Sequence, residues 1–200
     1  MTKIDAKTVK QLRDMTGAPM MDCKSALQEV GGDVEKARDV LRKRGQQVAD
    51  KASDRTVSEV LVYGYAHHNG KVGVMVEIVC ETDFVAMNED FKAFCHGVAL
   101  SVTAFNPAFL DKDAVPADSI EKEQAIVTEM TRAKMEGKPE KVIEKAVKGR
   151  MDKWFAEQTL MDKPYVPDDS KTIEQMRTEL VGKIGENIQV RRFMRMELGG

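Results

Sequence analysis

The residues with the clearest potential for chemistry follow a predicted strand in the middle of the chain. The apolar run Ile78-Val79-Cys80 ends at Glu81, and Thr82-Asp83-Phe84-Val85 follow it directly. The pattern indicates a strand leading to a tip that carries an aromatic ring beside a carboxylate. A large apolar side chain on a loop is typical of a contact for another macromolecule. The alternative is that Phe84 folds into its own core, where most Phe side chains lie, and the tip alone leaves both interpretations open.

A second segment, near the N-terminus, carries further candidate contact residues. It contains Arg13, the adjacent pair Met20-Met21, and Lys24. Neighbouring residues of a helix point in different directions, so both methionines cannot face the same small core. We expect one of them in the core and one presented outward, and the sequence leaves open which is which. Cys23 and Leu27 fit the core better than the surface.

Together, the two segments resemble the signature segments of the elongation factor Ts family. The resemblance continues in residues 164–166, 170–172 and 184–188, and so covers nearly the whole chain. Val79 stands where the family usually has Asn, and Met87 where it usually has a basic or amide residue. Neither departure falls within the Thr-Asp-Phe-Val core of the motif.

The resemblance implies a guanine-nucleotide exchange factor of translation elongation. Its implied partner is elongation factor Tu, in both the GDP-bound and the nucleotide-free form, from which it releases GDP so that GTP can bind. The residues implied to dock on the partner's nucleotide-binding domain are Arg13, Met20, Met21 and Lys24. The residues implied to wedge between helices of that domain and disturb its Mg²⁺ site are Thr82, Asp83, Phe84 and Val85.

The sequence offers no pattern for a nucleotide, cofactor or metal site of its own. A Gly-x-x-x-x-Gly-Lys-Ser/Thr phosphate loop is missing. His67 and His68 are adjacent on a predicted hairpin, so their side chains point to opposite faces. No nucleophile motif accompanies the histidines. We therefore expect no cofactor, no metal, no GTP hydrolysis and no covalent chemistry.

Composition restricts the class of protein further. The chain of 200 residues has a net charge of −2, and residues 1–55 hold 12 Lys and Arg against 9 Asp and Glu. This asymmetry is too mild to predict nucleic-acid binding. Three widely spaced cysteines argue for a reducing compartment. The sequence has neither a leader pattern nor an apolar run of membrane-spanning length, so we expect a cytoplasmic protein that binds no membrane.

The N-terminal segment predicts three short helices. Asp5 is a candidate cap of the first helix and Gly17 ends it, while Pro19 suits the start of the second. Gly31-Gly32 ends the second helix and Asp33 caps the third. The pattern resembles the ubiquitin-associated fold. A polar stretch over 46–55 predicts a boundary, so we assign residues 1–53 to a docking module and 54–200 to a core and dimerisation domain.

The remaining residues predict a small antiparallel sheet covered by helices. Strands over 57–65 and 72–78 are joined by a turn at Asn69-Gly70, and residues 188–197 alternate as a third strand that would pair with this hairpin. Helices are expected over 89–105, 116–136, 139–160 and 172–182. The predicted fold class is therefore α+β. Only one sheet-forming unit is present, whereas longer members of the resembled family have a duplicated core, so we expect a homodimer.

Two other functions are compatible with parts of this pattern. The three-helix module could belong to an adaptor that binds ubiquitin-like proteins, but such an adaptor has no need of the acidic and aromatic tip at Thr82–Val85. A metabolic enzyme is disfavoured because the sequence lacks a catalytic cluster.

Overall fold

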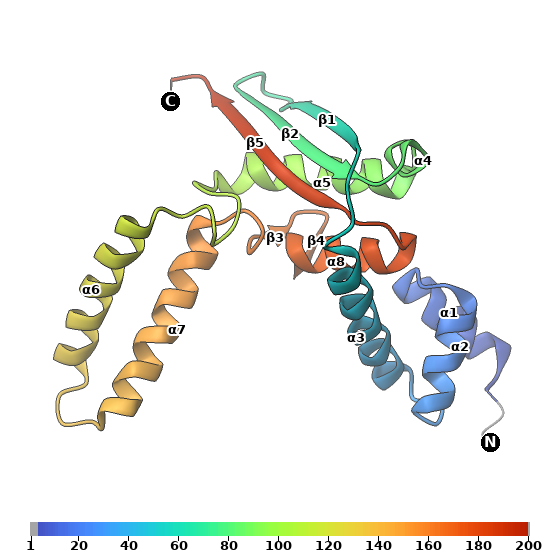
Figure 1. Cartoon of the computed structure of the whole chain (residues 1–200), viewed down its shortest axis with the longest axis horizontal. Helices are drawn as coiled ribbons and strands as arrows, with labels where there is room; N and C mark the ends of the chain where they lie inside the picture. The colour runs from blue at the N-terminus through green and yellow to red at the C-terminus, as the bar shows by residue number, and fades with distance from the viewer. Residues whose placement is uncertain (1–3, 200) are drawn as a thin grey trace. The chain divides into compact units, whose positions relative to one another are not determined.

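The computed structural model describes residues 4–199, so the first three residues of the predicted docking module and Gly200 lie outside the described residues. Figure 1 shows the elements along the chain. In chain order they are α1 (Ala6–Thr16), α2 (Met20–Glu29), α3 (Val34–Ala52), β1 (Glu59–Ala66), β2 (Val72–Cys80), α4 (Asp83–Ala86), α5 (Glu89–Phe105), α6 (Ala117–Lys134), α7 (Glu140–Gln158), β3 (Pro164–Tyr165), β4 (Asp168–Thr172), α8 (Ile173–Ile184) and β5 (Gln189–Glu197).

The chain divides into two compact units, each built from several segments. Unit 1 comprises Met1–Val62, Glu77–Cys95 and Gln175–Val190, and unit 2 comprises Tyr63–Val76, His96–Glu174 and Arg191–Gly200. Helices α1 to α3 and the Thr82–Val85 segment therefore both belong to unit 1. The functional boundary between residues 53 and 54 stays a prediction.

The three N-terminal helices form a small bundle around one apolar cluster (Figure 1). Its buried members are Val9, Leu12, Cys23, Ala26, Leu27 and Ala37. The turns follow local sequence, since Gly17 ends α1 at a φ of 66° and the Asp33 carboxylate accepts a hydrogen bond from the Lys36 amide at 3.1 Å. The core positions expected for Cys23 and Leu27 are confirmed.

The expectation for the adjacent methionines is wrong. Met20 and Met21 are both exposed, at 44% and 70%. Both lie in the first turn of α2, whose inward positions are filled by Cys23, Ala26 and Leu27. The apolar cluster is completed by partly buried side chains from elsewhere in the module, among them Val34, Val40 and Leu41.

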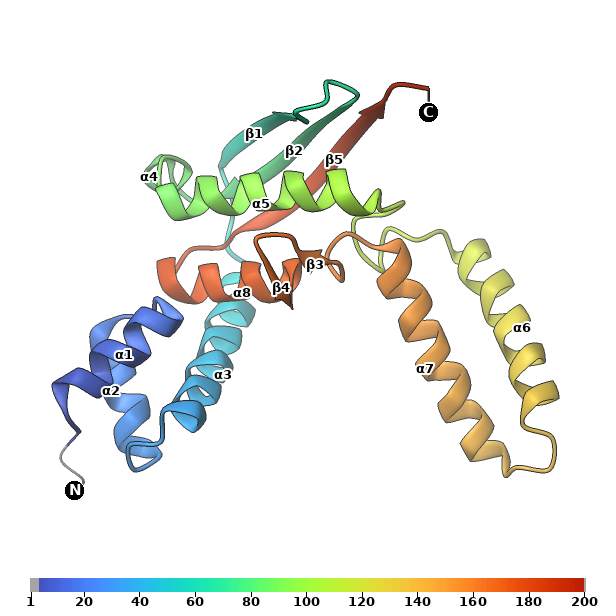
Figure 2. The ribbon, with the colours of Figure 1, turned by 180° about the vertical axis from the view of Figure 1, so that it is seen from behind.

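The main sheet has three strands in the order β1-β2-β5, so the C-terminal strand pairs with the hairpin as predicted. On β2, Val72, Val74, Val76 and Ile78 are buried, and helix α5 buries Phe91, Phe94, Cys95, Val98 and Val102. Figure 2 shows α5 lying along the sheet. The mixed sheet and helices confirm the α+β class. Strand β1 begins at Glu59, so Val57 precedes the strand in which it was expected.

The strand predicted over residues 188–197 is confirmed as β5, but burial along it does not alternate. Val190 is buried, but Arg192, Met194 and Met196, which share its parity, are exposed, and Phe193 is half-buried instead. Burial along β5 therefore does not follow the alternation of its sequence. How far each face of a strand is covered depends on the elements packed against it, and the alternation of the sequence does not show this.

Unit 2 contains a helical hairpin and a minor sheet. Helices α6 and α7 are joined by a short turn near which Arg132 and Glu140 form an ion pair at 2.7 Å. Strands β3 and β4, which the sequence did not predict, pair antiparallel. Tyr165 is buried with its ring where a side chain at Gly97 would stand, so Gly97 admits the tyrosine against α5. No helix within residues 4–199 is both long and apolar enough to cross a membrane.

Candidate functional site

The Thr82–Val85 segment forms a single helical turn at the end of β2. Helix α4 has only four residues, and the Thr82 hydroxyl caps it by accepting a hydrogen bond from the Val85 amide at 3.5 Å. Val85 is the buried side chain of this turn, at 7% exposure, whereas Phe84 is 82% exposed. The turn thus sends Val85 inward and Phe84 outward, which excludes the core position considered for Phe84.

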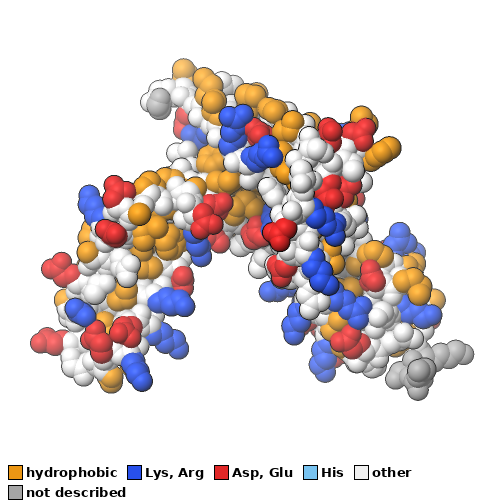
Figure 3. All heavy atoms as spheres, in the orientation of Figure 1, with side chains coloured by type: hydrophobic (Ala, Val, Ile, Leu, Met, Phe, Trp, Pro, Cys, Tyr) orange, Lys and Arg blue, Asp and Glu red, His pale blue; other side chains and the backbone are white. Residues whose placement is uncertain are grey.

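Met87 extends the exposed apolar surface beside Phe84. It follows three residues later, a spacing that returns to the same side of a helical turn, and it is 68% exposed. Figure 3 shows hydrophobic side chains over α4. Sequence reasoning noted Met87 only as a departure from the family pattern. Its spacing from Phe84 was the signal that could have identified it as a surface residue.

Val85, one of the four predicted wedge residues, lies inward. At 7% exposure its side chain anchors the turn, and its contact with the partner stays a prediction. Asp83 is exposed beside Phe84. Thr82 is half-buried, and its hydroxyl also donates to a carboxylate oxygen of Glu186 at 2.7 Å. Of the four predicted wedge residues, the structure presents two to solvent and uses the other two to hold them.

The docking residues predicted in the N-terminal module are all on its surface. Arg13 on α1 and Met20, Met21 and Lys24 on α2 are exposed. Met15 or Thr16 was expected on the inward face of the first helix, and Met15, at 47% exposure on α1, instead adds a further apolar side chain to this surface. Figure 3 shows hydrophobic side chains and Lys or Arg over α1 and α2. This mixture of Met and basic side chains suits a partner with an apolar surface bordered by acidic groups.

Helix α8 connects the module with the segment that carries Phe84. Gly182 of α8 meets Gly45 of α3 so closely that a Cβ added at Gly182 would lie 2.9 Å from the Gly45 Cα. The Lys183 Nζ forms an ion pair with Asp90 Oδ2, near the start of α5, at 2.7 Å. The Lys183 chain also lies against Gly17, since a Cβ added there would be 3.6 Å from its Cδ. Figure 2 allows α8 to be followed between these elements.

The cysteine thiols lie in surroundings that suppress their reactivity. Burial and, as a smaller contribution, the nearby Glu186 carboxylate raise the pKa of Cys80 to about 11. Burial likewise raises the pKa of Cys95 to about 12 and, by a smaller amount, that of Cys23. The thiolate is the nucleophilic form, so none of these side chains is set up for nucleophilic or redox chemistry at neutral pH.

His67 and His96 pair with tyrosines in unit 2. The hydroxyl groups of Tyr63 and Tyr65 lie 2.9 Å and 3.0 Å from Nδ1 of His96 and His67. In the part of the chain that the structure describes, no three His, Cys, Asp or Glu side chains come together in a group that could hold a metal ion. This cluster therefore has the character of a hydrogen-bonded aromatic patch.

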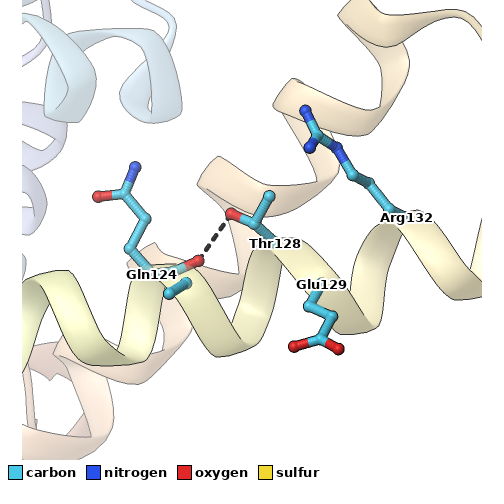
Figure 4. Close-up of a pocket in the computed structure, with 5 residues that line it drawn as sticks. Gln124, Thr128, Glu129 and Arg132 are labelled. Carbon is cyan, nitrogen blue, oxygen red and sulfur yellow. Dashed lines mark hydrogen bonds between the residues drawn. The ribbon is translucent and has the colours of Figure 1, made fainter.

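A hollow on α6 gives little for a ligand to bind. Figure 4 shows Gln124, Thr128, Glu129 and Arg132 around it, with Glu129 and Arg132 pointing in different directions. The Thr128 hydroxyl donates to the carbonyl of Gln124 in its own helix at 2.6 Å, and Arg132 is paired with Glu140. In a ligand site, several polar groups usually point toward one position. The polar side chains around this hollow do not converge in this way.

Known proteins are similar in sequence to this chain over most of its length. A family model described as elongation factor Ts matches residues 6–178. A protein of Desulforamulus reducens named elongation factor Ts is 48% identical over 100% of this chain and 91% of its own length. Proteins of the same name from Heliobacterium modesticaldum and Thermotoga petrophila are 48% and 44% identical, each over 98% of this chain and over 90% and 97% of their own lengths.

These matches make the chain a translation elongation factor. Within that class, it belongs to the elongation factor Ts family.

Proposed function

We propose that this protein is a guanine-nucleotide exchange factor that binds elongation factor Tu and releases GDP from it. The observation that carries the proposal is the outward position of Phe84, 82% exposed on a turn whose neighbour Val85 is buried. An isolated chain gains nothing from exposing a phenyl ring on a fixed turn. An aromatic anchor that fills a pocket of a partner is a common source of binding energy.

The proposed mechanism follows from thermodynamic linkage. GDP is held in its site by phosphate contacts and by a bridging Mg²⁺. A protein that binds the nucleotide-free form more tightly than the GDP form weakens GDP binding by the same factor. In this account, Phe84 enters between helices of the partner and Asp83 competes for the backbone donors around the phosphates. No covalent bond is made or broken, and the overall nucleotide equilibrium is unchanged.

The N-terminal module provides the second contact of the proposal. Arg13, Met20, Met21 and Lys24 would dock on the nucleotide-binding domain of the partner and hold the factor in place while Phe84 acts. The supporting observation is that both methionines are exposed on one small helical bundle. The adaptor for ubiquitin-like proteins is less well supported, because it leaves the exposed Phe84 without a role.

The chain is also proposed to act as a homodimer. The main sheet leaves apolar side chains uncovered on all three strands, namely Val60, Val62, Met75, Met194 and Met196, at 51–69% exposure. An exposed sheet of this kind is a liability unless another chain covers it. A second copy of the sheet offers a surface of the same chemistry and extent.

The experiment that tests the function uses elongation factor Tu loaded with a fluorescent GDP analogue. Substoichiometric amounts of this protein, with excess unlabelled GDP, should accelerate the loss of fluorescence through repeated turnover. The protein alone should hydrolyse no GTP. Unchanged release of the analogue over a wide titration would show that the proposed function is wrong.

A further inference from the structure

Glu186 is held against the tip that presents Phe84. It follows the last residues of α8, and its carboxylate receives two hydrogen bonds from one residue of the tip. The Thr82 hydroxyl donates to Oε1 at 2.7 Å, and the Thr82 amide donates to Oε2 at 3.1 Å. Hydrogen bonds to an ionised acceptor are about twice as strong as neutral ones, and a two-point contact also fixes orientation.

The hydroxyl of Thr82 is used twice in this arrangement. It donates a hydrogen bond to Glu186 and accepts one from the Val85 amide at 3.5 Å, so its two roles do not compete. The cap determines that residues 83–86 form a turn, and the carboxylate determines how that turn is oriented on the end of β2. With Val85 inward, the same orientation leaves Phe84 outward.

Neighbouring contacts tie this arrangement to the linker that follows the N-terminal module. The Glu81 carboxylate accepts from the Asn187 amide at 2.6 Å. Asn187 is only 1% exposed, and its side-chain amide donates to the carbonyls of Ser53 and Arg55 at 3.1 and 2.9 Å. Arg55 in turn donates to the Gly185 carbonyl at 2.9 Å. The loop of residues 185–187 therefore binds the tip on one side and the end of the module on the other.

We infer that Glu186 is a positioning residue, which orients the Thr82–Val85 segment for nucleotide exchange without touching the partner itself. The inference rests on the proposed function, because the tip is expected to act on a nucleotide-binding partner. Preorganisation of an anchor lowers the cost of ordering it on binding. A tip released from Glu186 would still carry Phe84 but would hold it in many orientations.

The first test compares Glu186→Ala with Glu186→Gln and with Glu136→Ala, a control at an exposed residue between α6 and α7. Glu186→Ala should lower the maximal rate of GDP release by about tenfold, the effect of losing roughly one charge-assisted hydrogen bond. The half-saturating concentration should change by less than about twofold, because the module still docks. The Gln variant keeps one acceptor oxygen and should recover part of the rate, and the control should match the unchanged protein.

The second test asks whether Glu186 acts through Thr82. Thr82→Ser keeps the hydroxyl and should exchange nucleotide nearly as well as the unchanged protein, whereas Thr82→Val should lose the rate as Glu186→Ala does. The double variant of Thr82→Val and Glu186→Ala should lose less than the product of the two single effects, because both substitutions remove the bond between the Thr82 hydroxyl and the Glu186 carboxylate. Independent multiplication of the two effects, or a full maximal rate for Glu186→Ala, would overturn the inference. If Glu186→Ala does not fold, Glu186→Gln decides the matter, since a full maximal rate in that variant would overturn the inference.

A third measurement needs no partner. Amide hydrogen exchange at Thr82 and Val85 in the free protein should become faster in Glu186→Ala and stay the same in Glu136→Ala. If the unchanged protein fails to release GDP from the partner, the proposed function is wrong, yet this measurement still decides the positioning role. Unchanged protection of both amides in Glu186→Ala would overturn the inference while leaving the proposed function standing.

Discussion

Phe84 and Val85 are neighbours with opposite surroundings, and this contrast carries most of the functional argument. One side chain is 82% exposed and the other 7%. The sequence predicted the tip, because an apolar strand ends there in polar residues. It could not predict which apolar residue points outward, since that depends on Thr82 and on Glu186, 104 positions later in the chain.

The buried thiols lead to a prediction at the residue scale. Iodoacetamide should label Cys80 and Cys95 slowly at pH 8 and rapidly after denaturation, because only the thiolate reacts. Their folded pKa values of about 11 and about 12 exceed the ordinary 9.0. The unfolded chain therefore releases these protons first, and the stability of the fold should fall as the pH rises above about 9. Fast labelling of the folded protein at pH 8, measured by mass spectrometry, would contradict this.

Met21 provides the residue-scale prediction for the module. Met21→Ala should raise the concentration needed for half-maximal GDP release by about tenfold, typical for truncating one interface side chain. Met130→Ala is the matched control, because Met130 is 49% exposed on α6 and has no place in the proposed contact. Both melting temperatures should stay near that of the unchanged protein. Equal effects of the two variants on exchange would remove the assigned docking role.

At the scale of elements, the crossing of α3 and α8 depends on two glycines. Gly182→Ala should lower the free energy of unfolding by about 1–3 kcal/mol, because its Cβ would meet the Gly45 backbone, which cannot give way easily. Gly149→Ala in α7 is the matched control. A Cβ there meets nothing within 4 Å, so the gain in helix propensity should raise stability by up to about 1 kcal/mol.

Urea unfolding of both glycine variants measures the difference directly. The two substitutions give the same propensity gain in a helix, so the difference between them reports the close crossing. If Gly182→Ala is as stable as Gly149→Ala, the crossing is looser than the structure shows.

The long elements could be predicted from the sequence, and the short ones could not. Periodicity over many residues predicted α5, and a cap and a glycine predicted the ends of α1, while a second cap predicted only the start of α3. Helix α3 continues to Ala52, through most of the polar stretch where a boundary was expected. Helix α4 is a single turn, and β3 has only two residues, so neither repeats a pattern often enough to be recognised. The sequence also could not predict that Met20 is exposed, because this depends on which other side chains fill the apolar cluster of the small bundle.

At the scale of the whole molecule, the uncovered sheet predicts self-association. Light scattering should give about twice the mass of one chain, because apolar side chains on three strands need a cover. Met75→Lys, on the central strand β2, should yield the monomer because two copies of the sheet would bring like charges together. Val142→Lys is the control, at a residue 44% exposed on α7. A monomer at micromolar concentration of the unchanged protein would contradict the proposed dimer.

Paired measurements on Phe84→Ala test the central claim most directly. The melting temperature should hardly change, because a side chain 82% exposed contributes little to the fold. GDP release from elongation factor Tu should fall about thirtyfold, since truncating an interface anchor costs about 2 kcal/mol or more. A core phenylalanine would instead lose about 3–5 kcal/mol of fold stability on truncation. A large drop in melting temperature, or GDP release at the unchanged rate, would contradict the account of Phe84 as the residue that opens the partner.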